Sequence, residues 1–153
     1  MTNQKNKKHH QNAAPAFPAQ DRRFQMTNAP KPLTASAIKY LLILLELCKN
    51  ETGARCMDIA GQLHVTKPSV HSMICNLCQS GLAEKKKYGA VFLTEQGHAE
   101  AERYAACYTL LLGRLHDALG LTDEAARSAA CAVLAQLTDE LTELEKRLGA
   151  QAS

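Results

Sequence analysis

The sequence predicts a mainly α-helical fold, in which a winged helix-turn-helix domain is followed by a helical dimerisation domain. Apolar residues at helical spacing lie on both sides of a tight turn at His64–Val65, and two short strand-like runs follow the second of these helices. From residue 95 onward, threonine N-caps and apolar stripes mark out helices alone. The 153 residues include no Trp and only 5% aromatic residues, so the core must consist mainly of aliphatic side chains.

Residues 1–33 are expected to form a disordered basic extension. They are rich in Asn, Gln, Ala, Pro and Lys and contain almost no large apolar residues. The extension either keeps the protein soluble or adds contacts to nucleic-acid phosphates, and the sequence leaves both interpretations open.

Three helices are expected next. Residues 37–50 are apolar on most sides, which indicates a helix buried by more than one neighbour. In the helix-turn-helix, Thr66 is placed to cap the second helix, Pro68 suits its first turn and Gly81 ends it. The apolar stripes of its two helices comprise Met57, Ile59, Ala60 and Leu63 in the first and Val70, Met73, Ile74 and Leu77 in the second.

A β-hairpin is expected to follow. Leu82–Lys85 and Ala90–Leu93 read as short strands joined by a tight turn, which is the position of a wing. The winged helix-turn-helix domain is therefore expected to span residues 34–97.

The helical dimerisation domain is expected over residues 98–149. Thr94 caps a helix over Glu95–Leu119, about 36 Å long at 1.5 Å per residue. Thr122 and Thr138 each precede an Asp-Glu pair and are placed to cap two further helices. The small, Ala-rich faces of this region favour close helix packing, either between two copies of the chain or within one.

The six cysteines indicate a reducing compartment. No secretory segment precedes them, and the first apolar run, Tyr40–Leu47, is too short to span a bilayer. We therefore expect a cytoplasmic protein with free thiols and no membrane partner. Cys75 and Cys78 share one helix face, and without a second pair they suit packing better than zinc binding.

A basic and polar set of side chains points to double-stranded DNA as the partner. A recognition helix must bring donors to base edges and phosphates from its first turns. The side chains expected on that face, opposite Val70 and Ile74, are Thr66, Lys67, Ser69, His71, Ser72 and, one turn further on, Asn76. The tip of the wing adds three positive charges and an aromatic ring for phosphate contact, namely Lys85, Lys86, Lys87 and Tyr88. With no Arg on the helix, direct reading of bases should be modest.

The order of short motifs carries a resemblance to a known family. The matching pieces are Tyr40-Leu41 with Glu46-Leu47, Asp58-Ile59-Ala60, Val65 to Val70, Gly81-Leu82, Tyr88-Gly89, Leu93 to Gly97, Leu119-Gly120-Leu121, and Cys131 with Leu137 to Leu141. Over residues 34–149 this order resembles the iron- and manganese-dependent repressors of the DtxR/MntR family. The resemblance implies a homodimer whose winged helix binds DNA and whose helical domain dimerises and holds Mn²⁺ or Fe²⁺. The SH3-like third domain of some members is not expected in these 153 residues.

At the positions that the resemblance implies for metal ligands, this chain carries mostly other residues. They are Lys39, Leu42, Tyr108, Leu112, Arg127 and the pair Leu134-Ala135, with Cys131 as the one ligand position retained. One thiol among aliphatic, phenolic and cationic side chains cannot replace several carboxylates and imidazoles. We therefore expect the family's metal site to be lost, which leaves the cofactor undetermined.

Three modes of control stay open. In the first, the protein binds DNA without metal, and Lys39 or Arg127 supplies the positive charge. In the second, it senses redox state through Cys131, Cys107 or Cys48. In the third, it binds an unknown small-molecule effector in the helical domain, or a different metal through His98, His116 and Asp117.

Two alternatives concern the functional class. Winged helices also serve as protein-interaction modules, and a recognition helix without Arg permits that alternative. An enzyme is not expected, because the chain has no Gly-rich phosphate loop and no nucleophile elbow. The best-supported interpretation is a sequence-specific DNA-binding transcriptional regulator, of the repressor type.

Overall fold

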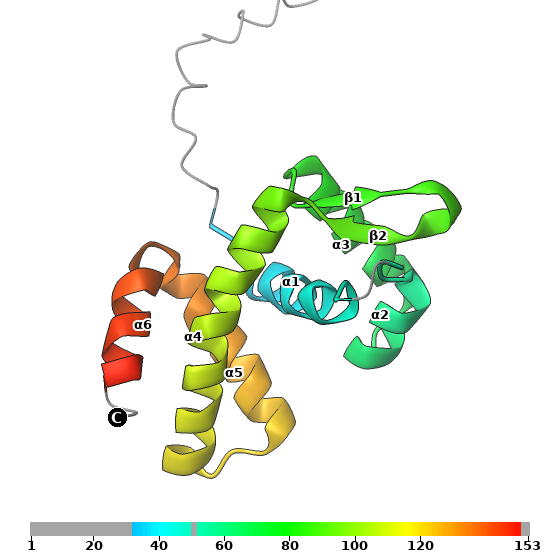
Figure 1. Cartoon of the computed structure of the whole chain (residues 1–153). Coiled ribbons are helices and arrows are strands. Elements are labelled where there is room, and N and C mark those ends of the chain that lie inside the picture. Colours follow the sequence, from blue (N-terminus) through cyan, green and yellow to red (C-terminus); the bar gives the residue numbers. More distant parts are fainter. Residues whose placement is uncertain (1–31, 50–51, 151–153) are drawn as a thin grey trace, which may run out of the picture. The chain divides into compact units, whose positions relative to one another are not determined.

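The computed structural model describes residues 32–49 and 52–150 (Figure 1). In chain order its elements are α1 (Ala35–Leu47), α2 (Cys56–Leu63), α3 (Lys67–Gln79), β1 (Ala83–Lys85), the 3₁₀ turn η2 (Lys87–Gly89), β2 (Val91–Leu93), α4 (Glu95–Leu119), α5 (Asp123–Gln136), the 3₁₀ turn η3 (Thr138–Glu140) and α6 (Leu141–Ala150). Within the described residues the sheet consists of β1 and β2 alone, so the predicted fold class, mainly helical with a winged helix-turn-helix followed by helices, is confirmed.

Threonine side chains begin four of the helices. The hydroxyl oxygens of Thr34, Thr66, Thr94 and Thr122 accept hydrogen bonds from the backbone N–H groups three residues on, as predicted for the last three. Thr34 caps α1, which runs from Ala35 to Leu47, so the predicted range of 37–50 was two residues too late at its start and three at its end. The extension predicted over residues 1–33 lies outside the described residues except for Pro32 and Leu33, and Leu33 packs against the protein core.

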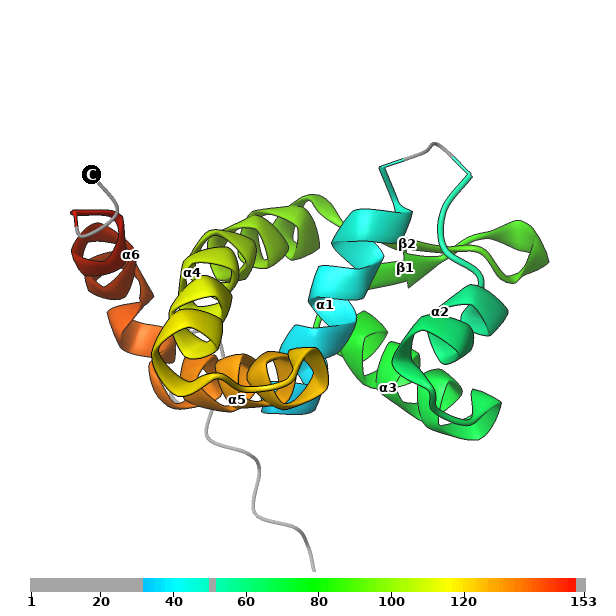
Figure 2. The ribbon, with the colours of Figure 1, turned by 90° about the horizontal axis from the view of Figure 1, so that it is seen from below.

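Two hydrophobic cores form, and α1 contributes to both. Leu41 and Leu44 of α1 pack into a core with α2, α3 and the β-hairpin, whereas Ile38 packs into a second core. The second core comprises Ile38, Tyr104, Cys107, Cys131, Leu134 and Leu141, which come from α1, α4, α5 and α6. Figure 2 shows α1 between α5 on one side and α2 with α3 on the other. Helix α1 is apolar on most sides because it is buried by more than one neighbour, as predicted. The domain boundaries at 34–97 and 98–149 stay predictions.

The prediction that Thr138 caps the last helix was wrong. Thr138 is buried, its Oγ1 accepts a hydrogen bond from the Tyr104 hydroxyl at 3.2 Å, and it lies 3.3 Å from the Ala135 carbonyl oxygen to which it donates. The chain makes the turn η3 before α6 begins at Leu141. The physical reason is that the buried phenol of Tyr104 needs a hydrogen-bond partner, and Thr138 supplies it.

A third short segment extends the wing. Strands β1 and β2 pair antiparallel with Glu84 opposite Phe92, and Ala54 forms an isolated bridge with Val91 through two backbone hydrogen bonds of 2.8 Å. No residue pattern predicts this bridge, because backbone groups alone form it. It ties the segment before α2 to the base of the wing.

Searched across its described residues, the structure contains no helix that is both long and apolar enough to cross a membrane.

Candidate nucleic-acid interface

The predicted DNA-facing side of α3 is exposed. Val70, Ile74 and Leu77 are buried in the core, which turns the opposite face of the helix to solvent. The exposed residues include every predicted contact on this helix: Thr66, Lys67, Ser69, His71, Ser72 and Asn76. The structure therefore brings these six side chains to one surface, as the helical period required.

Three of these residues also have local roles. Thr66 Oγ1 caps α3 by accepting from the Ser69 N–H at 3.4 Å, and it lies 2.9 Å from Ser69 Oγ. The His71 Nδ1 lies 3.7 Å from Cys75 Sγ, one helical turn along. Lys67, Ser72 and Asn76 have no side-chain hydrogen bond within the described chain, so these donors remain available to a ligand.

The three wing lysines are not equivalent. Lys86 Nζ lies 3.2 Å from Glu84 Oε1 and 4.5 Å from the centre of the Phe92 ring, which holds its side chain against the hairpin. Lys85 and Lys87 are exposed and form no ion pair in the described part of the chain. The prediction of three available charges overlooked Glu84, which precedes the lysines and offsets one of them.

Tyr88 stands at the tip of the wing with an unusual backbone. Its φ is +69° and its ψ is 15°, and its side chain is fully exposed. A residue with a Cβ is uncommon in this left-handed region unless it is Asn, Asp or His, because its Cβ crowds the backbone. The Tyr88 side chain is therefore fully in solvent at a strained backbone position.

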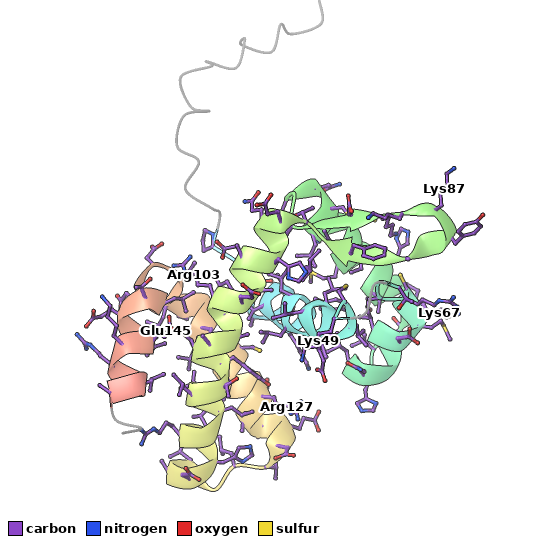
Figure 3. All side chains as sticks on the ribbon, in the orientation of Figure 1. Lys49, Lys67, Lys87, Arg103, Arg127 and Glu145 are labelled. Atoms are coloured by element: carbon purple, nitrogen blue, oxygen red, sulfur yellow. The ribbon has the colours of Figure 1, made fainter. Side chains whose placement is uncertain are left out.

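The recognition helix and the wing face the same side. Figure 3 shows Lys67 at the start of α3 and Lys87 at the wing tip, both projecting on the side away from α6. The end of α3 continues directly into β1, and Thr94 Oγ1 donates to the Gly81 carbonyl at 2.6 Å, which fixes the hairpin relative to α4. A groove-binding helix and a backbone-binding hairpin have this relation in winged helices.

One further cation belongs with this surface. Arg55 is exposed, directly precedes α2 and directly follows the Ala54–Val91 bridge at the wing base. A cation before the first helix of a helix-turn-helix suits phosphate contact, since that helix crosses the DNA backbone. The signal was present in the sequence as a basic residue beside the predicted helix start.

The predicted redox cysteines are mostly engaged or buried. Cys107 Sγ donates to the Leu141 carbonyl at 3.3 Å, and Cys48 Sγ donates to the Val91 carbonyl at 3.5 Å. Burial raises the pKa of the Cys107 thiol and of the Cys131 thiol, and for Cys131 the nearby Lys39 ammonium opposes the effect of burial. A raised pKa lowers the thiolate fraction, which is the reactive form.

Five of the eight residues at the implied metal positions line one cavity, whereas Leu112, Leu134 and Ala135 do not. It measures about 340 Å³ and its lining includes Lys39 and Leu42 of α1, Tyr108 of α4, and Arg127 and Cys131 of α5. Gln62, Leu63 and His64 at the end of α2 form another part of the wall. The described residues contain no group of three His, Cys, Asp or Glu side chains arranged to hold a metal ion.

Comparison with solved structures finds several chains of similar fold. IdeR of T. acidophilum is 28% identical, with a TM-score of 0.56 over 73% of this chain and 53% of that chain. ScaR with bound Zn²⁺ is 25% identical, with a TM-score of 0.53 over 74% and 53%. The manganese regulator SloR, at 24% identity, matches with a TM-score of 0.62 over 74% and 53% and supports the fold. The chain spans about half the length of each of these relatives.

No protein-family model and no curated protein sequence matches the chain. The solved relatives include a manganese regulator and a manganese-activated repressor. The resemblance expected from the order of motifs is thereby confirmed.

Proposed function

We propose that this protein, whose fold and motif order are those of the DtxR/MntR-like metal-dependent repressors, is a cytoplasmic DNA-binding transcriptional repressor. The observation that carries the proposal is the exposed polar face of α3 beside the two unpaired wing lysines, Lys85 and Lys87. In this arrangement α3 enters the major groove and the wing contacts the phosphates alongside it.

The chemistry of α3 favours moderate base discrimination. Asn76 can form a bidentate pair with adenine, Lys67 can reach guanine or a phosphate, and hydroxyls serve either. The charges that dominate affinity come from the wing, where Lys85 and Lys87 are unpaired among the described residues and Lys86 is partly neutralised by Glu84. Binding should therefore depend steeply on salt, because each neutralised phosphate releases counterions.

Titration of a fluorescent duplex, selected from a random-sequence library, tests the proposal at several salt concentrations. Lys85→Ala and Lys87→Ala should each lower the slope of log affinity against log salt by about 1, because each removes one phosphate contact. Lys86→Ala should lower it by about half as much, because Glu84 already holds that ammonium.

Lys146→Ala serves as the control, since it removes an exposed lysine from α6, outside the proposed interface. If the wing variants kept the wild-type slope, phosphate contact by the wing would be wrong. If wild-type protein bound no duplex, or bound it without salt dependence, the protein-interaction alternative would replace the DNA proposal.

The proposed assembly is a homodimer formed through α4 and α5. Leu119 is 64% exposed and Val133 37% exposed, and Leu112 and Leu115 of α4 are only half-buried within one chain. A second copy is the occupant that fits, because two-fold related recognition helices match two half-sites on DNA.

Sedimentation velocity tests the dimer. Leu115→Glu should convert it to monomer at micromolar concentration, because the new carboxylate would lie in an apolar contact. Met57→Glu places the same charge at an exposed apolar residue of α2 and should leave the dimer intact. Equal behaviour of the two variants would place the interface elsewhere.

The cavity at the implied metal positions does not suit Mn²⁺ or Fe²⁺. Hard and borderline divalent ions need several oxygen or imidazole donors, whereas Lys39 and Arg127 bring positive charge to this site. The one thiol there, Cys131, is buried and its pKa is raised by that burial, which disfavours the thiolate that a metal requires. We therefore propose that the protein binds DNA without a divalent metal.

Fluorescence titration with and without a chelator tests metal independence. EDTA should leave DNA affinity essentially unchanged, and added Mn²⁺ should not raise it. A loss of binding in EDTA that Mn²⁺ restores would contradict the proposal.

A further inference from the structure

The cavity between α1, α2, α4 and α5 opens to solvent and is large enough for a small molecule. Its volume is about 340 Å³. Pockets that bind small molecules begin at about 300 Å³, so this one is at the lower end of their range. Leu42, Ile43 and Leu63 give it an apolar wall, and Tyr108 and Cys131 add polarisable groups. This combination suits a compact ligand with an apolar body.

Two cations at this cavity have no partner in the described chain. The ion pairs found there are Lys86–Glu84, Arg103–Glu100, His116–Asp123 and Arg147–Glu143, so neither Lys39 nor Arg127 is neutralised by a carboxylate. Both cations act on the interior of the cavity. The Lys39 ammonium lowers the pKa of Cys131 against the larger effect of burial, and Arg127 opposes the burial that raises the pKa of Tyr108.

The carboxylates on the cavity lining are engaged locally or face solvent. Asp123 Oδ1 lies 3.3 Å from His116 Nε2, and Asp123 and Glu124 occupy the first turn of α5, where a negative charge interacts favourably with the helix dipole. Glu46 is exposed at the last turn of α1. The lining therefore carries three carboxylates beside its two cations, and Lys39 and Arg127 are the groups on it that an anion would contact.

We propose that this cavity binds a small organic anion, with its acidic group between Lys39 and Arg127 and its apolar body against Leu42, Ile43 and Leu63. The guanidinium of Arg127 offers a fork that matches a carboxylate or phosphate, and Lys39 adds a second charged donor. Figure 3 shows Arg127 projecting from α5 on the side where α2 lies. The chain thus places an anion site where its resemblance to metal-dependent repressors implies a cation site.

A ligand in the cavity would contact the end of α2 and the turn that leads into α3. Gln62, Leu63 and His64 close α2, and His64 begins the turn into α3 with a left-handed φ of 52°. A ligand held by α1 and α5 against this turn restrains the helix-turn-helix relative to the helical core. This regulatory consequence rests on the proposed DNA-binding function, whereas binding of the anion does not.

Thermal unfolding of the full chain, without DNA, tests the site with benzoate, butyrate, inorganic phosphate and MnCl₂, each against NaCl of equal ionic strength. Benzoate and butyrate at saturation should raise the Tm by about 3 °C, and phosphate, which has no apolar body, should raise it by less than half as much. In Lys39→Gln with Arg127→Gln the shift should fall below about 1 °C. The control pair Arg114→Gln with Lys146→Gln removes two exposed cations outside the cavity and should keep the shift.

Four results would overturn the proposal: no shift beyond that of NaCl, an equal shift with phosphate, an undiminished shift in the Lys39 and Arg127 double variant, or stabilisation by Mn²⁺ alone. Both substituted residues are exposed, so the double variant should fold with the wild-type Tm in the absence of anions. Since no DNA is present, failure here is distinguishable from failure of the proposed DNA binding.

Discussion

Gly97 and Gly113 lie in the same helix and are expected to respond to alanine in opposite ways. A Cβ at Gly97 would overlap the carbonyl oxygen of Leu82 and lie 2.8 Å from its carbonyl carbon, whereas a Cβ at Gly113 would meet nothing within 4 Å. The first contact is with backbone, which cannot rotate away as a flexible side chain can. Gly97→Ala should therefore force the β-hairpin and α4 apart.

The magnitude follows from what holds these two segments together. The Thr94 N–H donates to the Leu82 carbonyl at 3.1 Å, and Thr94 Oγ1 donates to the Gly81 carbonyl at 2.6 Å. Each such bond is worth about 1 kcal/mol, and overpacking costs about 1 to 3 kcal/mol. The better helix propensity of Ala returns up to about 1 kcal/mol. Gly97→Ala should thus lower the free energy of unfolding by about 3 kcal/mol, or the Tm by about 10 °C.

Gly113→Ala is the matched control, because it makes the same substitution in the same helix at an exposed position. It should raise the free energy of unfolding by about 1 kcal/mol through helix propensity alone. Urea unfolding followed by circular dichroism, at one protein concentration for all variants, measures both changes. Changes of the same sign and similar size in the two variants would refute the close approach of Gly97 to Leu82.

Three further outcomes are expected. The free energy of unfolding should fall as the pH rises above about 8.5, because burial raises the pKa of Cys107, Cys131 and Tyr104 in the folded protein. The unfolded chain then loses these protons at a lower pH than the folded chain, which favours unfolding. Equal urea midpoints at about pH 7 and about pH 10 would contradict this. Thr138→Val should cost about 1 to 3 kcal/mol, since it leaves the buried Tyr104 hydroxyl without its acceptor, and Tyr104→Phe in the same background should recover part of the loss in thermal unfolding. Tyr88→Gly should change the Tm little or raise it, because it relieves a positive φ at a fully exposed residue, and yet weaken DNA binding in the fluorescence titration if the ring touches the duplex.

The parts of the fold that the sequence predicted are those set by local chemistry. Thr66, Thr94 and Thr122 cap helices through residues three positions away, so a short window contains the whole interaction. Thr138 failed as a cap because its partner Tyr104 lies 34 residues earlier in the chain, and no window around Thr138 contains it. The Ala54–Val91 bridge escaped prediction for the same reason, with the addition that it involves no side chain at all.

In the candidate interface too, the sequence predicted the features that local residues determine and missed those that depend on other segments. The exposed face of α3 followed from helical periodicity, since burying Val70 and Ile74 fixes which residues point outward. The number of lysines in the wing did not predict how many of their charges are available. Glu84 of β1 and Phe92 of β2 lie opposite each other, and both contact Lys86. The positive φ of Tyr88 depends on the geometry of the turn, and its neighbour Gly89 also has a positive φ of +77°.

Helix α1 is the element through which the cavity and the DNA-binding surface can influence each other. Its residues alternate between the two cores: Ile38 packs with α4, α5 and α6, whereas Leu41 and Leu44 pack with α2, α3 and the wing. Lys39, Leu42 and Ile43, which line the cavity, lie on the same two turns. Packed cores tolerate rigid shifts better than local deformation. A ligand held against Lys39, Leu42 and Ile43 would therefore contact the same helix that packs beneath α3, and α1 is the element through which the proposed anion would act on the candidate interface.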